Sequence, residues 1–236
     1  MIACVHQPNF LPWLGFFAKI AAADVYLAMD NVQFPRNSWV NRVRIGGNGP
    51  AMWLSVPVKH SGQLDVTIRD VEISWESDWS QKILKTLQQR YARSPWRSTV
   101  LGPVEHHFAQ RYRLLAYQNL ALIDEVLALC RIERKVMRGS GLHANGAGSA
   151  LIAAMCREIG ATTYLAGQGS SGYEERSVYN DAGIQYETSS FSHPHYEQRN
   201  RESFEPGLSI LDALLSVGPD ATREMLLTSS GPMPSR

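Results

Sequence analysis

Residues 2–30, IACVHQPNFLPWLGFFAKIAAADVYLAMD, hold the pattern that decides the fold class of this chain. Residues 2–5 form a short apolar run that is typical of a buried strand, and Pro8 disfavours helix directly after it. From Trp13 onward, apolar residues recur at helical spacing, and a second apolar run at residues 25–29 ends on Asp30. A strand, a short helix and a second strand in about thirty residues predict one βαβ unit.

The middle of the chain follows a different pattern. Three strand-like runs, residues 43–45, 53–58 and 66–73, are separated by the turn-forming sequences GGNGP and HSGQ. Helical periodicity then covers residues 79–91 and 106–130, and Gly102-Pro103 falls in the connection between these two helices. We therefore expect a small antiparallel region followed by two helices.

The last third returns to alternating strands and helices. The pattern predicts a helix over 151–159 closed by Gly160, a strand over 162–166, a glycine-rich loop over 167–172, a helix over 173–182 and a strand over 184–187. A short helix is expected over 208–215. The predicted fold class is α/β, with a mostly parallel sheet from βαβ units at both ends and an inserted antiparallel β and helical region. We expect a single domain over residues 1–227, with about residues 43–105 inserted and 228–236 as a flexible tail.

Composition excludes several classes of protein. The chain has 236 residues, with 23 Lys and Arg against 22 Asp and Glu, which argues against bulk nucleic-acid binding. The three cysteines, Cys4, Cys130 and Cys156, have no CxxC spacing and are expected to be reduced and mostly buried. The N-terminus lacks a signal-peptide pattern, and no apolar run approaches the ~20 residues that span a bilayer. These features predict a cytoplasmic protein, and they give no indication of its oligomeric state.

The loop after the first strand, HQPNFLPW, is the first candidate site. His6 follows the first strand and Asp30 follows the second, and parallel strands place their carboxyl ends at the same edge of a sheet. An imidazole and a carboxylate at one edge predict a catalytic pair, in which His6 is the general base and Asp30 orients it. The alternative, which we favour less, is that His6 caps backbone groups inside the fold.

Amides and an arginine extend this candidate site. We expect Gln7, Asn9 and Asn41 to hydrogen-bond a polyhydroxylated ligand, and Arg42 to bind a phosphate or carboxylate. A surface ion pair is the competing interpretation for Arg42. Arg36, Arg42, Arg44 and Lys59 form a basic stretch near this loop, which predicts a local affinity for a small anionic donor.

The glycine-rich loop is the second candidate site. GQGSSG at residues 167–172 has the spacing of a dinucleotide fingerprint, but too few residues follow it for a complete dinucleotide-binding sheet and a substrate domain. Glycines before a helix still favour anion binding, so Gly167, Gln168, Gly169 and Ser170 are predicted to bind substrate. A purely structural turn is the alternative. Neither His193 and His195 nor His106 and His107 match a metal-site pattern, and we expect no metal and no cofactor.

Five segments carry a resemblance to a known family: HQPNFLPWLGFFAKI, DNVQFPRNSWVNRVRI, WLSVPV, TYLAGQGSSGY and FEPGLSILDALL. In this order, from Ile2 to about Gly218, they resemble the WbqC-like protein family. The resemblance implies a role in bacterial surface-polysaccharide (O-antigen) or natural-product biosynthesis, with glycyl transfer as one suggested activity. It also implies a site at His6, Gln7, Asn9, Asp30, Asn41 and Arg42, with Gly167 to Ser170 facing it.

Three hypotheses of function follow. The first is a transferase that moves a small acyl or aminoacyl group, with glycyl as one option, from a small activated donor to a sugar-like or amine acceptor. The second is a nucleotide-binding enzyme that catalyses nucleotidyl transfer or adenylation, although no HxGH pair is present. The third is a non-catalytic partner in a biosynthetic complex, in which Trp39, Trp53 and Trp96 form contacts.

Overall fold

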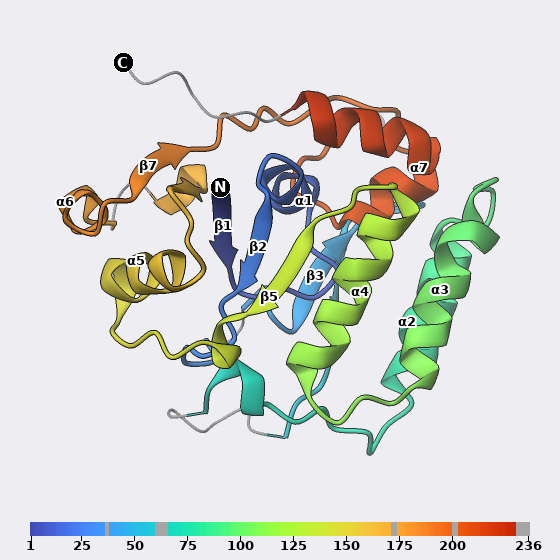
Figure 1. The fold of residues 1–236 in the computed structure, drawn as a ribbon. Helices are drawn as coiled ribbons and strands as arrows, with labels where there is room; N and C mark the ends of the chain where they lie inside the picture. The colour runs from blue at the N-terminus through green and yellow to red at the C-terminus, as the bar shows by residue number, and fades with distance from the viewer. Residues whose placement is uncertain (36–37, 60–65, 171–173, 200–202, 230–236) are drawn as a thin grey trace.

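The computed structural model describes residues 1–35, 38–59, 66–170, 174–199 and 203–229. A five-stranded parallel sheet with the order β5-β2-β1-β6-β7 lies at the centre of the described residues (Figure 1). Its strands are β1 (Ile2–His6), β2 (Val25–Ala28), β5 (Lys135–Arg138), β6 (Thr163–Ala166) and β7 (Gln185–Thr188). A separate antiparallel pair consists of β3 (Arg42–Ile45) and β4 (Met52–Ser55). The predicted α/β class is confirmed.

Helices pack on both faces of this sheet, because the side chains of a buried strand alternate between faces. Ala3 and Val5 of β1 belong to one hydrophobic core with α5 and α6, whereas Cys4 belongs to a larger core with the other helices. The α-helices are α1 (Leu14–Ala21), α2 (Trp79–Arg90), α3 (Arg97–Ala109), α4 (Leu115–Leu129), α5 (Gly148–Glu158), α6 (Arg176–Asp181) and α7 (Ile210–Thr228). Short 3₁₀ turns are η1 (Ile68–Asp70), η2 (Gly139–Gly141) and η3 (Gln168–Ser170).

The order of the strands reverses direction at β1. From β1 the chain passes to β2 and β5 on one side, then returns to place β6 and β7 on the other side (Figure 1). The β1–β2 pairing extends to His6 and Ala28, but the β1–β6 pairing ends at Ala3 and Tyr164. The carboxyl ends of β1 and β6 therefore diverge, which is the arrangement that opens a ligand crevice in doubly wound sheets.

Two predicted features of the middle region are wrong. The expected strand over 66–73 is instead the 3₁₀ turn η1 with isolated bridges, because the backbone N–H groups of Ile68 and Arg69 donate to Val32 and Asp30 beside the main sheet. Gly102 and Pro103 lie inside α3 rather than in a connection. Val100, Leu101, Val104 and Phe108 of this helix are buried, and their packing outweighs the low helix propensity of Gly and Pro.

Two other elements differ in existence or length. The strand β5 was not predicted, because its sequence KVMR is short and mixes charged with apolar residues at the edge of the sheet. The last helix, α7, is much longer than residues 208–215 and is kinked at Gly218, which precedes Pro219. Most of the predicted tail, residues 230–236, lies outside the described residues. In the part of the chain that the structure describes, no helix combines the length and hydrophobicity needed to cross a membrane.

Candidate functional site

A cavity of about 690 Å³ lies at the diverging ends of β1 and β6. Its lining includes His6 at the end of β1 and Gln7 directly after it, Lys19 of α1, Gly167 to Gly169 after β6, and Gly148 and Ser149 at the start of α5. Segments that are more than 140 residues apart in the sequence thus meet at the point where the strand order reverses. This is the usual place for a ligand in an open α/β sheet.

His6 lines this cavity, and its side chain is held by one hydrogen bond and one ring contact. Its Nδ1 lies 3.0 Å from the carbonyl O of Gln7, and its ring packs edge-on against Phe16 with centroids 5.2 Å apart. Burial, with a smaller contribution from the charge of Lys19, lowers the pKa of His6 from 6.5 to about 3. A carbonyl oxygen only accepts, so Nδ1 carries the proton and Nε2 of the neutral ring can accept one.

The structure does not bring Asp30 to His6. Asp30 is fully buried at the end of β2, and its carboxylate accepts hydrogen bonds from the backbone N–H and the hydroxyl of Ser140, both at 2.7 Å. Asp30 does not line the cavity. Asp30 therefore bonds to the end of the neighbouring strand and not to His6. The reason is β5, which the sequence pattern did not predict and which places Ser140 next to the Asp30 carboxylate.

Three other predicted ligands of the substrate also lie outside the cavity lining. Asn9 is buried, and the amide nitrogen of Asn41 donates to the carbonyl O of Val56 at 3.1 Å. Arg42 stacks its guanidinium over the exposed ring of Trp53, 4.5 Å from the ring centroid. Of the residues predicted to form the site around the HQPN loop, His6 and Gln7 line the cavity and the others do not.

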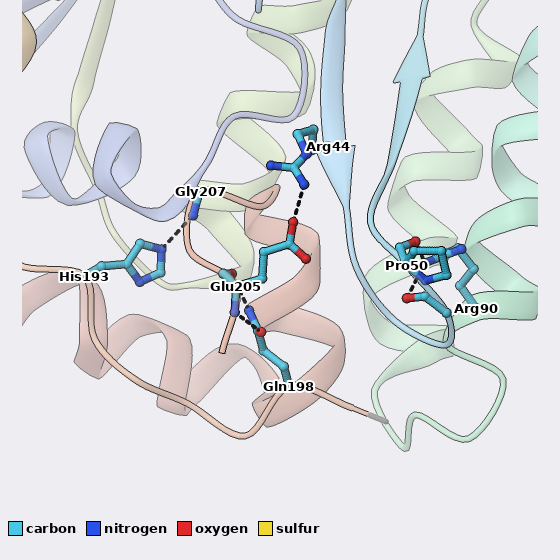
Figure 2. Close-up of polar contacts among 8 residues, drawn as sticks. Arg44, Pro50, Arg90, His193, Gln198, Glu205 and Gly207 are labelled. Carbon is cyan, nitrogen blue, oxygen red and sulfur yellow. Dashed lines mark hydrogen bonds and ion pairs between the residues drawn. The ribbon is translucent and has the colours of Figure 1, made fainter. Parts of the chain in front are cut away.

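Two residues of the predicted basic stretch, Arg44 and Lys59, form ion pairs. Arg44 pairs with Glu205, whose loop is also held by Gln198 (Figure 2). Lys59 pairs with Glu72 at 2.9 Å. Arg36 and Asn37 lie outside the described residues. The described side chains of the basic stretch therefore do not contribute positive charge to the cavity lining.

The glycine-rich loop follows β6, and its first residues line the cavity. Gly167, Gln168 and Gly169 contribute to the lining, and the amide nitrogen of Gln168 donates to the carbonyl O of Phe191 at 2.9 Å. Ser170 ends η3, and residues 171–173 of the GQGSSG sequence lie outside the described residues. In a dinucleotide-binding fold this fingerprint belongs to the first βα turn, which here is the HQPN loop.

Several lining residues were not predicted. Lys19 is buried, with 5% of its surface exposed, and its Nζ donates to the carbonyl O of Val5 at 3.3 Å. The sequence did contain a sign that Lys19 is special, because it is the one charged residue in the otherwise apolar helix sequence LGFFAKIA. Tyr164 donates its hydroxyl to Glu174 at 3.0 Å, and both residues line the cavity. Burial raises the pKa of Tyr164 well above its usual value, so this hydroxyl stays protonated.

Among the described residues, no cluster of three or more histidine, cysteine or carboxylate side chains could hold a metal ion. The cavity instead offers an imidazole, an amine, a carboxylate, a phenol and backbone N–H groups. The start of α5 also lines the cavity, through Gly148 and Ser149. This helix start is uncapped, because Ala147 makes no side-chain capping bond. Helix N-termini and glycine loops both favour anions.

Comparisons with known proteins identify a related sequence and a matching family. A curated relative, the uncharacterized protein Rv1507c of Mycobacterium tuberculosis (strain ATCC 25618 / H37Rv), is 26% identical over 220 residues, which cover 91% of this chain and 93% of the relative. No solved structure matches the chain significantly. The model of one family, the WbqC-like protein family, matches residues 7–224, a range that begins directly after His6 and includes Gln7, Lys19 and the glycine-rich loop. The chain therefore belongs to the WbqC-like protein family.

Proposed function

We propose that this protein is a transferase that moves a small acyl or aminoacyl group, with glycyl as one candidate, from an activated anionic donor to an amine or hydroxyl. The single observation that carries the proposal is the shared cavity. It presents the neutral imidazole of His6 together with the glycine-rich loop and the uncapped start of α5. Group transfer needs a proton acceptor and a site for the donor's anionic part in one place.

In this proposal, His6 removes the proton of the acceptor. Nε2 of His6 takes the proton as the acceptor nitrogen or oxygen attacks the acyl carbon, and the bond from that carbon to the leaving group breaks. The proton on His6 then passes to the leaving group. The acceptor is a sugar-like or amine compound, which fits a role in surface-polysaccharide or natural-product biosynthesis, and Gln7 is positioned to hydrogen-bond it.

The low pKa of His6 has a consequence for this chemistry. An imidazole with a pKa of about 3 is unprotonated at neutral pH, yet it is a weak base. A nearby negative charge stabilises the imidazolium, so an anionic donor in the cavity raises the pKa of His6. His6 thus becomes an effective base once the donor is bound.

The experiment is a transfer assay with a panel of acyl and aminoacyl coenzyme A thioesters and amino-sugar acceptors, read out as thiol release. We expect release that depends on the acceptor and falls by about 10²-fold or more in His6→Ala. His143→Ala is the matched control, because His143 has a 99% exposed side chain and does not line the cavity. Equal turnover of His6→Ala and wild type would remove His6 from the mechanism.

The strand order favours a second candidate function, nucleotide chemistry. The order β5-β2-β1-β6-β7 is that of doubly wound nucleotide-binding sheets, and the cavity lies at its switch point. In this case the activated donor is a nucleoside triphosphate or a nucleotide sugar. A thermal-shift titration with ATP, CTP, UDP-sugars and thioesters separates the two. Stabilisation by a nucleoside triphosphate alone would favour nucleotidyl transfer or adenylation over acyl transfer from a thioester.

A further inference from the structure

Lys19 is a buried amine that lines the cavity. Its Nζ donates to the carbonyl O of Val5 at 3.3 Å, a long bond that uses one of the three ammonium hydrogens. No ion pair joins Lys19 to a carboxylate in the described part of the chain. A buried ammonium without an ionic partner is costly to a fold, and this cost is relieved when a ligand supplies the missing anion.

The residue opposite Lys19 is a glycine. A Cβ atom placed on Gly167 would lie 3.8 Å from Nζ, so a side chain there would occupy the space beside the ammonium group. Because position 167 is glycine, Nζ remains open toward the loop of residues 167–169 and the cavity. The same cavity is lined by Gly148 and Ser149, the first residues of the uncapped α5.

We propose that Lys19 binds a phosphoryl group of the ligand, which sits between Nζ and the backbone of Gly167 to Gly169. This inference rests on the proposed function to the extent that the phosphoryl group belongs to the activated donor. A phosphoryl group suits the site better than a carboxylate does, because its oxygens point in several directions. Here the positive groups come from α1, from the loop after β6 and from the start of α5.

The charge of Lys19 responds to its ligand. The groups that face it are Cys4 and His6 of β1 and Glu174 ahead of α6, and the Glu174 carboxylate already accepts the hydroxyls of Tyr164 and Tyr179. In the unliganded protein, burial lowers the pKa of Lys19. A bound anion raises it again, so binding takes up a proton in the pH window between the two pKa values. Affinity for the anion therefore falls as the pH rises through this window.

The test is equilibrium binding of inorganic phosphate, pyrophosphate and acetate, measured by calorimetry on wild type, Lys19→Met and Lys19→Arg. We expect pyrophosphate to bind the wild type most tightly, Lys19→Met to lose at least about tenfold in affinity, and Lys19→Arg to retain part of it. Lys82→Met is the matched control, since Lys82 is exposed on α2 and lies outside the cavity. Unchanged pyrophosphate affinity in Lys19→Met would overturn the proposal, and tighter binding of acetate than of pyrophosphate would overturn its phosphoryl part.

A second measurement does not depend on the folding of a variant. Amine-specific reductive methylation of the wild-type protein, quantified by mass spectrometry, compares Lys19 with Lys82 in the presence and absence of pyrophosphate. We expect pyrophosphate to protect Lys19 at least severalfold and Lys82 not at all, and equal reactivity of Lys19 in both conditions would contradict the proposal. Neither measurement needs turnover. Failure of the transfer assay would thus leave Lys19-dependent anion binding intact, and failure of anion binding would leave a functional transferase without this site.

Discussion

The Asp30 carboxylate accepts two hydrogen bonds from Ser140, one from its backbone N–H and one from its hydroxyl, each at 2.7 Å. The two residues are 110 positions apart in the sequence. Asp30 follows β2 and Ser140 lies in η2 directly after β5, so this contact ties the carboxyl ends of two neighbouring strands together. It gives Asp30 a structural partner where the sequence suggested a catalytic one.

Removing either side of this contact is expected to destabilise the protein. Asp30→Ala leaves the half-buried N–H and hydroxyl of Ser140 without this acceptor and should lower the free energy of unfolding by about 2 kcal/mol. Ser140→Ala removes only the hydroxyl and should cost about 1 kcal/mol. Urea denaturation of both variants and of the double variant measures the coupling energy, which we expect to be about 1 kcal/mol. Strictly additive losses would show that the hydroxyl contact contributes nothing.

His6 makes the stability of the fold depend on pH. The pKa of His6 is about 3 in the folded protein and 6.5 in a free histidine, so below pH 6.5 the unfolded chain binds a proton that the folded chain does not. Between pH 8 and pH 5 this linkage should lower the free energy of unfolding by about 2 kcal/mol. Over the same pH range, we expect the free energy of unfolding of His6→Gln to fall by about 2 kcal/mol less than that of the wild type. Denaturant unfolding at each pH measures both values. The two proteins would show parallel pH profiles if His6 titrated normally in the folded state.

Substituting alanine for two helical glycines, Gly102 of α3 and Gly218 of α7, should change the stability of the fold in opposite directions. Gly102 lies inside α3, and apart from its chain neighbours and its own helix backbone no atom of the described residues lies within 4 Å of an added Cβ. Gly102→Ala should therefore raise the free energy of unfolding, by about 0.5 kcal/mol or less because Pro103 disfavours a side chain at the preceding residue. Gly218 has a φ of 89°, and an added Cβ would lie 2.4 Å from Cε2 of Trp96. Gly218→Ala should therefore lower the free energy of unfolding by about 2 kcal/mol or more. Thermal unfolding of both variants checks the signs, and a stabilised Gly218→Ala protein would be inconsistent with the kink in α7.

The three cysteines should be unreactive in the folded protein. All three are buried and free, and burial raises the pKa of Cys4 to about 11 and those of Cys130 and Cys156 to about 12. Because the thiolate is the reactive form, a disulfide reagent such as dithionitrobenzoate should react slowly with the native protein and with three thiols after denaturation. Rapid reaction of a native thiol would indicate that its helix or strand opens readily.

The strands and helices at both ends of the chain could be predicted, because each has a periodic apolar pattern within a short window. This holds for β1, α1 and β2 in the first thirty residues, and for β6 and β7 near the glycine-rich loop. The pattern failed where packing overrides local preference, as at Gly102 and Pro103 inside α3, and where the element is short, as at β5. His6, Gln7 and the loop of residues 167–169 line one cavity, and each lies at or directly after the end of a buried strand.

The sequence by itself determined that this chain is an α/β protein, that its polar loops follow buried strands, and that it has the motifs of the WbqC-like family. Only the tertiary structure decided that β6 lies beside β1, that Asp30 accepts hydrogen bonds from Ser140, and that the Nζ of Lys19 lies beside Gly167. The physical reason is the range of the interactions. Periodicity reports which face of one element is buried, whereas the order of strands in a sheet depends on contacts between residues far apart in the chain.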